Sequence, residues 1–319
     1  MLGLRRYRVA LVLAAIVVGA LVATTADGLA AQPNPGLEVL HGAHIMRVRD
    51  AGKHAATASN LFYQGANPGV ETGADKVYLV YWGSQWNSND PSNEAATQQG
   101  FFNGVGGSAW NNSVTQYCEG VAAGTVFCNG GTAATNPSGV LGGVWYDNTS
   151  KAPSHPSQSQ LAQEAVRAAA HFGNKTAASN STVQYAVNTA THNNSRGFGV
   201  QYCAWHSSTS SSYGTLAYTN MPYITDAGTS CGANFSGLGL AAGITIVGGH
   251  EFAETETDIF PSGGWVDSAG YENGDKCAWI SSGQGAAADI SLGTGTFAVQ
   301  SLWSNAFNSN KGGCVLSYP

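Results

Sequence analysis

The sequence predicts an α/β or α+β fold in a single compact, disulfide-bonded domain. Strand-like runs of β-branched and aromatic residues alternate along the chain with helical patterns, as in sheets covered by helices. No repeat of fixed period and no long linker interrupts this order, so one globular domain at 65–319 accounts for it. The six cysteines are an even number without Cys-x-x-Cys spacing, which favours disulfides over a zinc–thiolate site.

The expected elements begin with a buried strand. Residues 77–82 are a continuous β-branched and aromatic run, typical of a strand covered on both faces. Ser92 and Asn93 are expected to cap a helix that ends near residue 102, and Gly173 to end a helix at 157–172. Further strands are expected at 140–146, 183–187, 201–205 and 216–223, and a largely apolar helix within 240–258.

Residues 1–31 have the order of a secretory signal. Arg5, Arg6 and Arg8 precede an uncharged run from 9 to 22, and small residues follow up to Ala31. That run is shorter than the roughly 20 apolar residues that a transmembrane helix needs. We therefore expect export, cleavage of the signal, and a secreted protein that no membrane holds.

Residues 32–64 are expected to form an N-terminal arm or pro-segment. They contain few large aliphatic residues, so they offer little to a core. His41, His44 and His54 lie in this arm, and we expect solvent around them rather than a metal.

The charge balance excludes one class of partner. Thirteen Lys and Arg against 19 Asp and Glu give a formal net charge of −6. A surface that binds nucleic acid needs the opposite sign. We expect no nucleic-acid partner, and a monomer.

The cysteine positions predict a set of three bridges. Export would place the cysteines in an oxidising compartment, and six cysteines allow 15 pairings. Loop-closure entropy favours near neighbours. The expected bridges are Cys118–Cys128, Cys203–Cys231 and Cys277–Cys314, the last of which would join the segment around Cys277 to the C-terminal residues.

The residues that point to chemistry form the pattern His250-Glu251-x-x-Glu254 at the end of the apolar helix. Positions i and i+4 share a helix face, so His250 and Glu254 can approach one ion. Glu251 lies one step around the helix, where it can reach a water beside that ion. The pattern resembles the His-Glu-x-x-His helix of the zincin metallopeptidases, in which two histidines bind zinc and the glutamate is the general base.

The second ligand position departs from the zincin pattern, because Glu254 stands where a histidine is expected. One imidazole with two carboxylates would cancel the charge of a divalent ion and weaken it as a Lewis acid. Oxygen-rich ligation also admits manganese or calcium, although zinc is favoured.

A third ligand is expected from the segment that leads to Cys277. Glu272 is favoured over Asp275, which could instead support a ligating histidine through a hydrogen bond. Asp258, two turns after His250, is the remaining candidate.

The alternative to a metal site is a capped, solvated helix end. Against it, four acids crowd this helix end in a chain that is only 10% charged: Glu251, Glu254, Glu256 and Asp258. Like charges so placed repel unless a cation or protons compensate them.

A second resemblance covers roughly residues 76–314. It rests on the segments 77–83, 203–206, 222–223, 257–258, 274–277 and 299–303 together with Cys314. In these segments the chain resembles bacterial secreted relatives of the plant phosphate-induced (Exordium) family. That resemblance implies an extracellular location without implying catalysis.

These patterns predict a secreted metal-dependent hydrolase, foremost a zinc metallopeptidase acting on a peptide or protein. Glu251 would be the general base. His206 follows a disulfide cysteine closely, so a structural role is expected, with stabilisation of an oxyanion as its catalytic alternative. The competing hypothesis is a non-catalytic extracellular or cell-wall-associated protein whose acidic cluster is structural or binds calcium.

Overall fold

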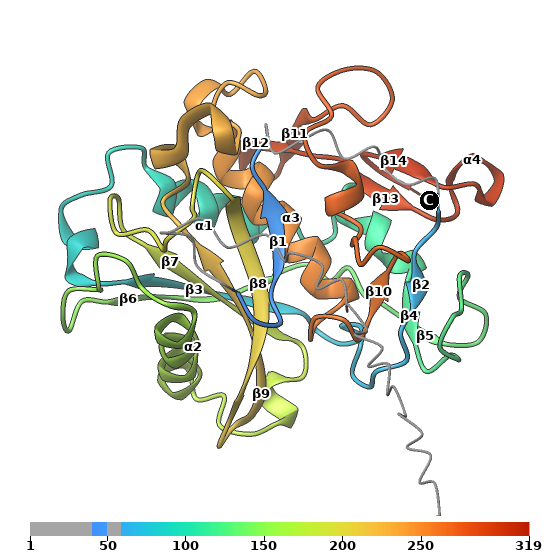
Figure 1. Cartoon of the computed structure of the whole chain (residues 1–319), viewed down its shortest axis with the longest axis horizontal. Helices are drawn as coiled ribbons and strands as arrows, with labels where there is room; N and C mark the ends of the chain where they lie inside the picture. Colours follow the sequence, from blue (N-terminus) through green and yellow to red (C-terminus); the bar gives the residue numbers. More distant parts are fainter. Residues whose placement is uncertain (1–39, 50–58, 319) are drawn as a thin grey trace, which may run out of the picture. The chain divides into compact units, whose positions relative to one another are not determined.

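The computed structural model describes residues 40–49 and 59–318, which are built around a six-stranded mixed sheet (Figure 1). Its strands are β1 (His44–Arg47), β3 (Lys76–Trp82), β6 (Leu141–Asp147), β7 (Val183–Thr189), β8 (Tyr202–Ser211) and β9 (Gly214–Met221). The order across the sheet is β1-β8-β9-β7-β3-β6. The last four strands in that order are parallel, whereas β8 and the edge strand β1 run antiparallel to their neighbours.

Helices cover both faces of this sheet. These helices are α1 (Glu94–Gly104), α2 (Gln158–Phe172) and α3 (Ala242–Thr257), while the short α4 (Phe307–Asn310) lies beside strand β14 (Gly313–Val315). Figure 1 shows α2 on one face and α3 on the other. Leu79 and Tyr81 of β3 belong to the core on the α1 and α3 side, while Val80 and Trp82 pack with α2 on the opposite face. Successive side chains of a strand point to opposite faces, so β3 contributes to two apolar layers. Residues 77–82 are therefore hydrophobic without alternation.

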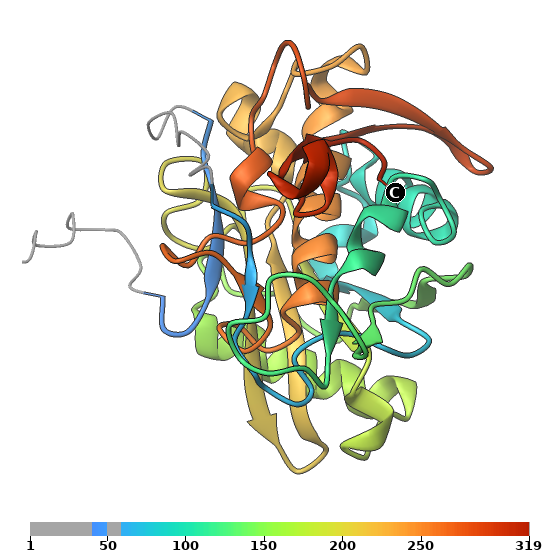
Figure 2. The same ribbon diagram turned by 90° about the vertical axis from the view of Figure 1, so that its right-hand side faces the viewer.

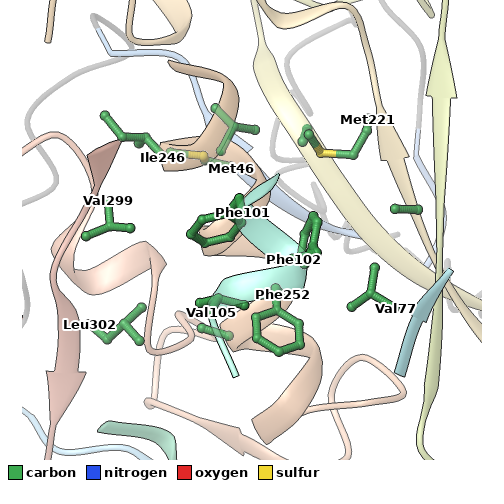
Figure 3. Close-up of a cluster of buried hydrophobic side chains, with 14 of the residues drawn as sticks. Met46, Val77, Phe101, Phe102, Val105, Met221, Ile246, Phe252, Val299 and Leu302 are labelled. Carbon is green, nitrogen blue, oxygen red and sulfur yellow. The ribbon is translucent and has the colours of Figure 1, made fainter. Parts of the chain in front are cut away.

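The larger core fixes α3 against its neighbours. Figure 3 shows Phe101 and Phe102 of α1, Phe252 of α3 and Met221 of β9 in one cluster. Phe102 and Phe252 meet edge to face, with ring centroids 5.7 Å apart. Such aromatic pairs stabilise their contact by about 0.5–1.5 kcal/mol beyond the burial of their area. The helix that carries the candidate site is therefore held on the side away from His250 and Glu254.

Short elements complete the described chain. Figure 2 shows the β11–β12 hairpin extending from the rest of the fold, and its turn contacts α1 through a hydrogen bond from Thr294 Oγ1 to Gly100 O of 2.7 Å. The paired strands are β2 (Phe62–Tyr63) with β10 (Trp265–Val266), β4 (Cys118–Glu119) with β5 (Thr132–Ala133), β11 (Ala288–Leu292) with β12 (Gly295–Val299), and β13 (Leu302–Ser304) with β14 (Gly313–Val315). The 3-10 helices are η1 (Ser84–Asn87), η2 (Asn111–Gln116), η3 (Ala178–Asn180), η4 (Ile224–Cys231), η5 (Gly239–Ala241) and η6 (Asp275–Cys277).

The expected strands and helices are confirmed, with two corrections. The segment 32–64 does contribute to the core: β1 joins the six-stranded sheet, β2 pairs with β10, and Met46, Leu61 and Tyr63 are buried. The other correction is at a cap. Ser157 caps α2 through a capping box and Gly173 ends it in the left-handed conformation, as the sequence predicts. Asn93 does not cap α1 with its side chain; instead Asp90 accepts hydrogen bonds from the amides of Glu94 and Ala95. None of the helices in the described residues is long and apolar enough to cross a membrane. The expected signal at 1–31 and His54 lie outside the described residues.

All three expected disulfides are present. Cys118 is bonded to Cys128, Cys203 to Cys231 and Cys277 to Cys314. Three bridges of this kind indicate an oxidising environment. The last bridge joins η6 to β14 and so ties the segment around Asp275 to the C-terminal hairpin.

Candidate metal centre

Helix α3 is buried along its entire length, including its polar end. His250 and Glu254 lie one turn apart, and His250 Nε2 is 3.0 Å from Glu254 Oε1. The i, i+4 spacing therefore brings the two side chains together as predicted. The other imidazole nitrogen, His250 Nδ1, lies 3.2 Å from Gln300 Oε1, whose amide nitrogen donates to Gly274 O. Gln300 thus fixes the ring so that Nε2 faces the carboxylate.

Asp275 completes the group around His250 and Glu254. Its backbone amide donates to Glu254 Oε1 at 2.8 Å, and its Oδ1 lies 3.8 Å from His250 Nε2. One ligand atom from each of the three residues lies within 4.8 Å of the others. The preference for Glu272 as the third member of this group is not supported, because Glu272 lies with two other histidines.

Those two histidines reach Glu272 from neighbouring strands. His44 of β1 and His206 of β8 are direct partners in the antiparallel register. His44 Nδ1 lies 2.7 Å from Glu272 Oε2, and His206 Nε2 lies 2.9 Å from the same oxygen. The expectation of solvent around His44 is therefore wrong, whereas His41 is exposed as expected. His206 is buried and hydrogen-bonded, as a structural histidine would be, and its ring also belongs to the cluster.

Glu251 and Glu254 link the two groups. His206, Glu251 and Glu254 each place a ligand atom within 4.8 Å of the others. Glu254 Oε2 lies 3.6 Å from His206 Nε2 while Oε1 faces His250. Glu251 is buried, and within the described residues neither of its carboxylate oxygens has a hydrogen-bond partner. Seven side chains thus form one cluster, which we call the histidine–carboxylate cluster: His44, His206, His250, Glu251, Glu254, Glu272 and Asp275.

Several oxygens of the cluster lack partners in the described part of the chain. They include Glu254 Oε2 and Glu272 Oε1 as well as both oxygens of Glu251. A buried carboxylate oxygen without a partner is unfavourable by several kcal/mol on an order-of-magnitude scale. Imidazole nitrogens and carboxylate oxygens are the ligands that zinc takes in proteins. The donor set therefore fits a divalent transition metal.

The pKa values of the cluster residues also indicate that the site needs positive charge. The charge of Glu272 raises the pKa of His44 to about 10. Burial lowers the pKa of His206 and His250, but Glu272 and Glu254 outweigh it and raise those pKa values to about 9 and about 10. Burial raises the pKa of Glu272, and the two neighbouring histidines reverse this and hold it well below its usual range. The cluster needs positive charge, which protons supply in the cation-free protein and a divalent cation supplies when bound.

The four acids of the helix end separate into three environments. Glu251 and Glu254 face the cluster, whereas Glu256 accepts a hydrogen bond from Asn111 on another side of α3. Asp258 accepts bonds from the backbone amides of 262, 263 and 264 at 2.7, 2.9 and 2.6 Å. Asp258 therefore organises the turn after α3, and it is not among the metal-binding groups of the described residues.

Access to the cluster is narrow. The side chains of His206, His250, Glu254 and Glu272 are at most 1% exposed, whereas those of His44 and Asp275 are 15% and 14% exposed. Solvent meets the cluster at these two residues, one in each group.

Comparisons with models of known protein families, with curated proteins and with solved structures return no match to this chain. The resemblances to the zincin helix and to the phosphate-induced family stay predictions from the sequence. Function is therefore argued from the cluster itself.

Proposed function

We propose that this protein is a secreted, divalent-cation-dependent hydrolase of the metallopeptidase kind, acting on peptide or protein substrates. His250, Glu254 and Asp275 would hold the catalytic cation. Zinc suits this site better than calcium or manganese, because each group of the cluster includes an imidazole. Imidazole suits zinc, whereas calcium and manganese are suited by oxygen ligands. The disulfides and the signal-like residues 1–31 support export.

The observation that carries the proposal is the position of Glu251. It follows His250 on α3, its carboxylate is buried, and both of its oxygens lack a hydrogen-bond partner among the described residues. Burial raises the pKa of Glu251 well above its usual range, and a cation bound beside it would favour the ionised carboxylate, which can accept a proton from water. A bound cation would supply a Lewis acid that polarises the scissile carbonyl and acidifies water.

In this proposal Glu251 and Gln300 have separate roles. Glu251 would take the proton of the attacking water and return it to the leaving amine. Gln300 would keep the His250 ring oriented through the Nδ1 contact. The expected oxyanion role of His206 is not carried forward, because its Nε2 already faces Glu272.

A second candidate function rests on the burial of the ligands. A cation enclosed by side chains that are at most 15% exposed would also suit a non-catalytic, extracellular cation-binding protein. Both candidates predict bound metal, and only the first predicts turnover.

Glu251→Gln separates the two candidates, because it keeps the size of the side chain and removes the base. We expect metal content, measured by elemental mass spectrometry, to stay at the wild-type level. Hydrolysis of a broad peptide library, measured by mass spectrometry, should fall by about 10²-fold or more. The control is Asp289→Asn on the exposed strand β11, which should change neither quantity.

Three results would overturn parts of this proposal. Loss of metal in Glu251→Gln makes Glu251 a ligand, and undiminished turnover places the activity elsewhere. Metal-loaded wild-type protein that hydrolyses nothing in the library favours the non-catalytic candidate.

A further inference from the structure

The proposed catalytic cation gives no role to three of the seven side chains in the cluster. His44, His206 and Glu272 are not needed to hold it, yet they converge as closely as the residues that do. They come from an edge strand, its neighbour and a loop beyond α3, and they are separated by more than 60 residues in sequence. Burial of two imidazoles and a carboxylate at one point is unfavourable unless the groups are paired with one another or bind a cation.

The sheet register explains how these side chains meet. His44 and His206 are opposite one another in the antiparallel pair β1–β8. Opposite residues in such a pair have Cβ atoms about 4.5–5.5 Å apart on the same face. Their ring centroids are 5.7 Å apart and both rings approach Glu272 Oε2, while Glu272 Oε1 is buried without a partner among the described residues. A cross-strand pair of histidines with a carboxylate is a chelating arrangement.

Glu254 is placed to belong to both groups. Its Oε1 is 3.0 Å from His250 Nε2, and its Oε2 is 3.6 Å from His206 Nε2. Within the described chain Oε2 has no hydrogen-bond partner and is buried. A carboxylate that presents one oxygen to each of two ligand sets can bridge two cations, which in such sites stand about 3.5–4 Å apart.

Charge balance favours two cations over one. The cluster holds four carboxylates and three imidazoles. With neutral imidazoles, one divalent cation leaves two negative charges in a buried site, whereas two divalent cations compensate all four carboxylates. Asp258 is a further buried acid that acts electrostatically on His44, His206 and Glu272, but three backbone amides donate to its carboxylate and it is not among the metal-binding groups of the described residues.

We propose that the histidine–carboxylate cluster holds two divalent transition-metal cations bridged by Glu254, the second bound by His44, His206 and Glu272. The second site shares Glu254 with the proposed catalytic site but does not depend on hydrolysis. Metal content therefore tests it whether or not the protein proves to be an enzyme.

The test uses purified protein, shown by intact mass to retain His44, loaded with Zn²⁺ and dialysed. Elemental mass spectrometry should find about two zinc ions per wild-type chain, as two built sites require. His44→Ala and His206→Ala should each retain about one, and His250→Ala should also retain about one through the other site. His41→Ala is the matched control, since His41 is an exposed histidine three residues before His44, and it should keep two.

Circular dichroism melts check that each variant is folded. If His206→Ala does not fold, His44→Ala at the sheet edge tests the same site. Retention of two zinc ions in His44→Ala overturns the proposal. One zinc ion or none in the wild type also overturns it, and this outcome is expected if protonated histidines neutralise Glu272 without a second metal. Two zinc ions without hydrolysis leave this inference standing and remove the proposed function; hydrolysis with a single zinc ion does the reverse.

Discussion

At the scale of single residues, buried acids in this protein are compensated in two different ways. Glu256 lies two residues after Glu254 but is buried near Glu71 and Asp75. Burial raises the pKa of Asp75 to about 7 and those of Glu71 and Glu256 well above their usual range. No histidine takes part, and these three acids are not among the metal-binding groups of the described residues. Protons compensate this second set.

Asp75→Asn tests that assignment through the pH dependence of stability. An acid whose pKa rises on folding stabilises the protein below its unfolded pKa of about 4, and that stability is lost as the pH rises towards the folded pKa. For Asp75 the loss falls between about pH 4 and the folded pKa of about 7. The amide of the variant does not titrate. The melting temperature of the variant should therefore rise relative to that of the wild type as the pH increases across this range. We expect a gain of several degrees, because about 1 kcal/mol shifts the melting temperature by roughly 2–4 °C and a rise in pKa from 3.8 to about 7 corresponds to roughly 4 kcal/mol at most.

The surroundings of Asp75 define the control. Glu71, Thr135 and Lys76 act directly on its carboxyl, and Thr135 Oγ1 donates to it at 2.9 Å. Asparagine keeps an acceptor for that hydrogen bond. The exposed Asp289→Asn should follow the wild type at every pH. Parallel wild-type and Asp75→Asn melting curves from pH 4 to 8 would show that Asp75 is not held protonated.

At the scale of elements, the cluster depends on the close approach of the 272–275 segment to α3. A Cβ added to Gly274 would lie 2.8 Å from His250 Nδ1 and 2.9 Å from Glu254 Oε1. The backbone of Gly274 is right-handed helical, with φ −76°, so alanine would be free of backbone strain there. Only the space beside His250 and Glu254 requires glycine.

Gly274→Ala should therefore weaken metal binding while the fold is kept. The methyl group must displace His250 or Glu254, and changes beside metal ligands reduce metal affinity by about 10–100-fold. Competition with a chromophoric zinc chelator measures this change. Gly293→Ala, where a Cβ meets nothing within 4 Å, is the matched control and should bind zinc as the wild type does. Equal affinities in all three proteins would contradict the position given to Gly274.

The same elements show what the sequence could predict. The spacing of His250 and Glu254 is local, so helical geometry alone placed the two side chains together. The approach of Asp275 was expected only in outline, through the Cys277–Cys314 bridge. His44 was not recognised, because its role depends on pairing with a strand more than 150 residues away. A short strand at a sheet edge carries no periodicity that reveals its partner.

At the scale of the whole described fold, local patterns predicted the alternating elements and the three near-neighbour bridges. They could not predict the strand order, since β6 and β7 lie on opposite sides of β3 and β1 joins the far edge. That order decides the site, because it brings β1 and β8 beside the polar end of α3. The candidate centre therefore depends on the topology of the sheet. His44 and His206 meet Glu272 and the α3 residues His250 and Glu254 only when the sheet is complete.

The most direct test of the central claim, that this buried cluster binds divalent cations, is anomalous X-ray diffraction at the zinc edge from crystals of the zinc-loaded protein. We predict two peaks about 3.5–4 Å apart on either side of Glu254. One should be bonded to His250 and Asp275, and the other to His44, His206 and Glu272 at about 2.0–2.2 Å. Density for the intact cluster without an anomalous peak, with the histidines still hydrogen-bonded to Glu254 and Glu272, would contradict the account.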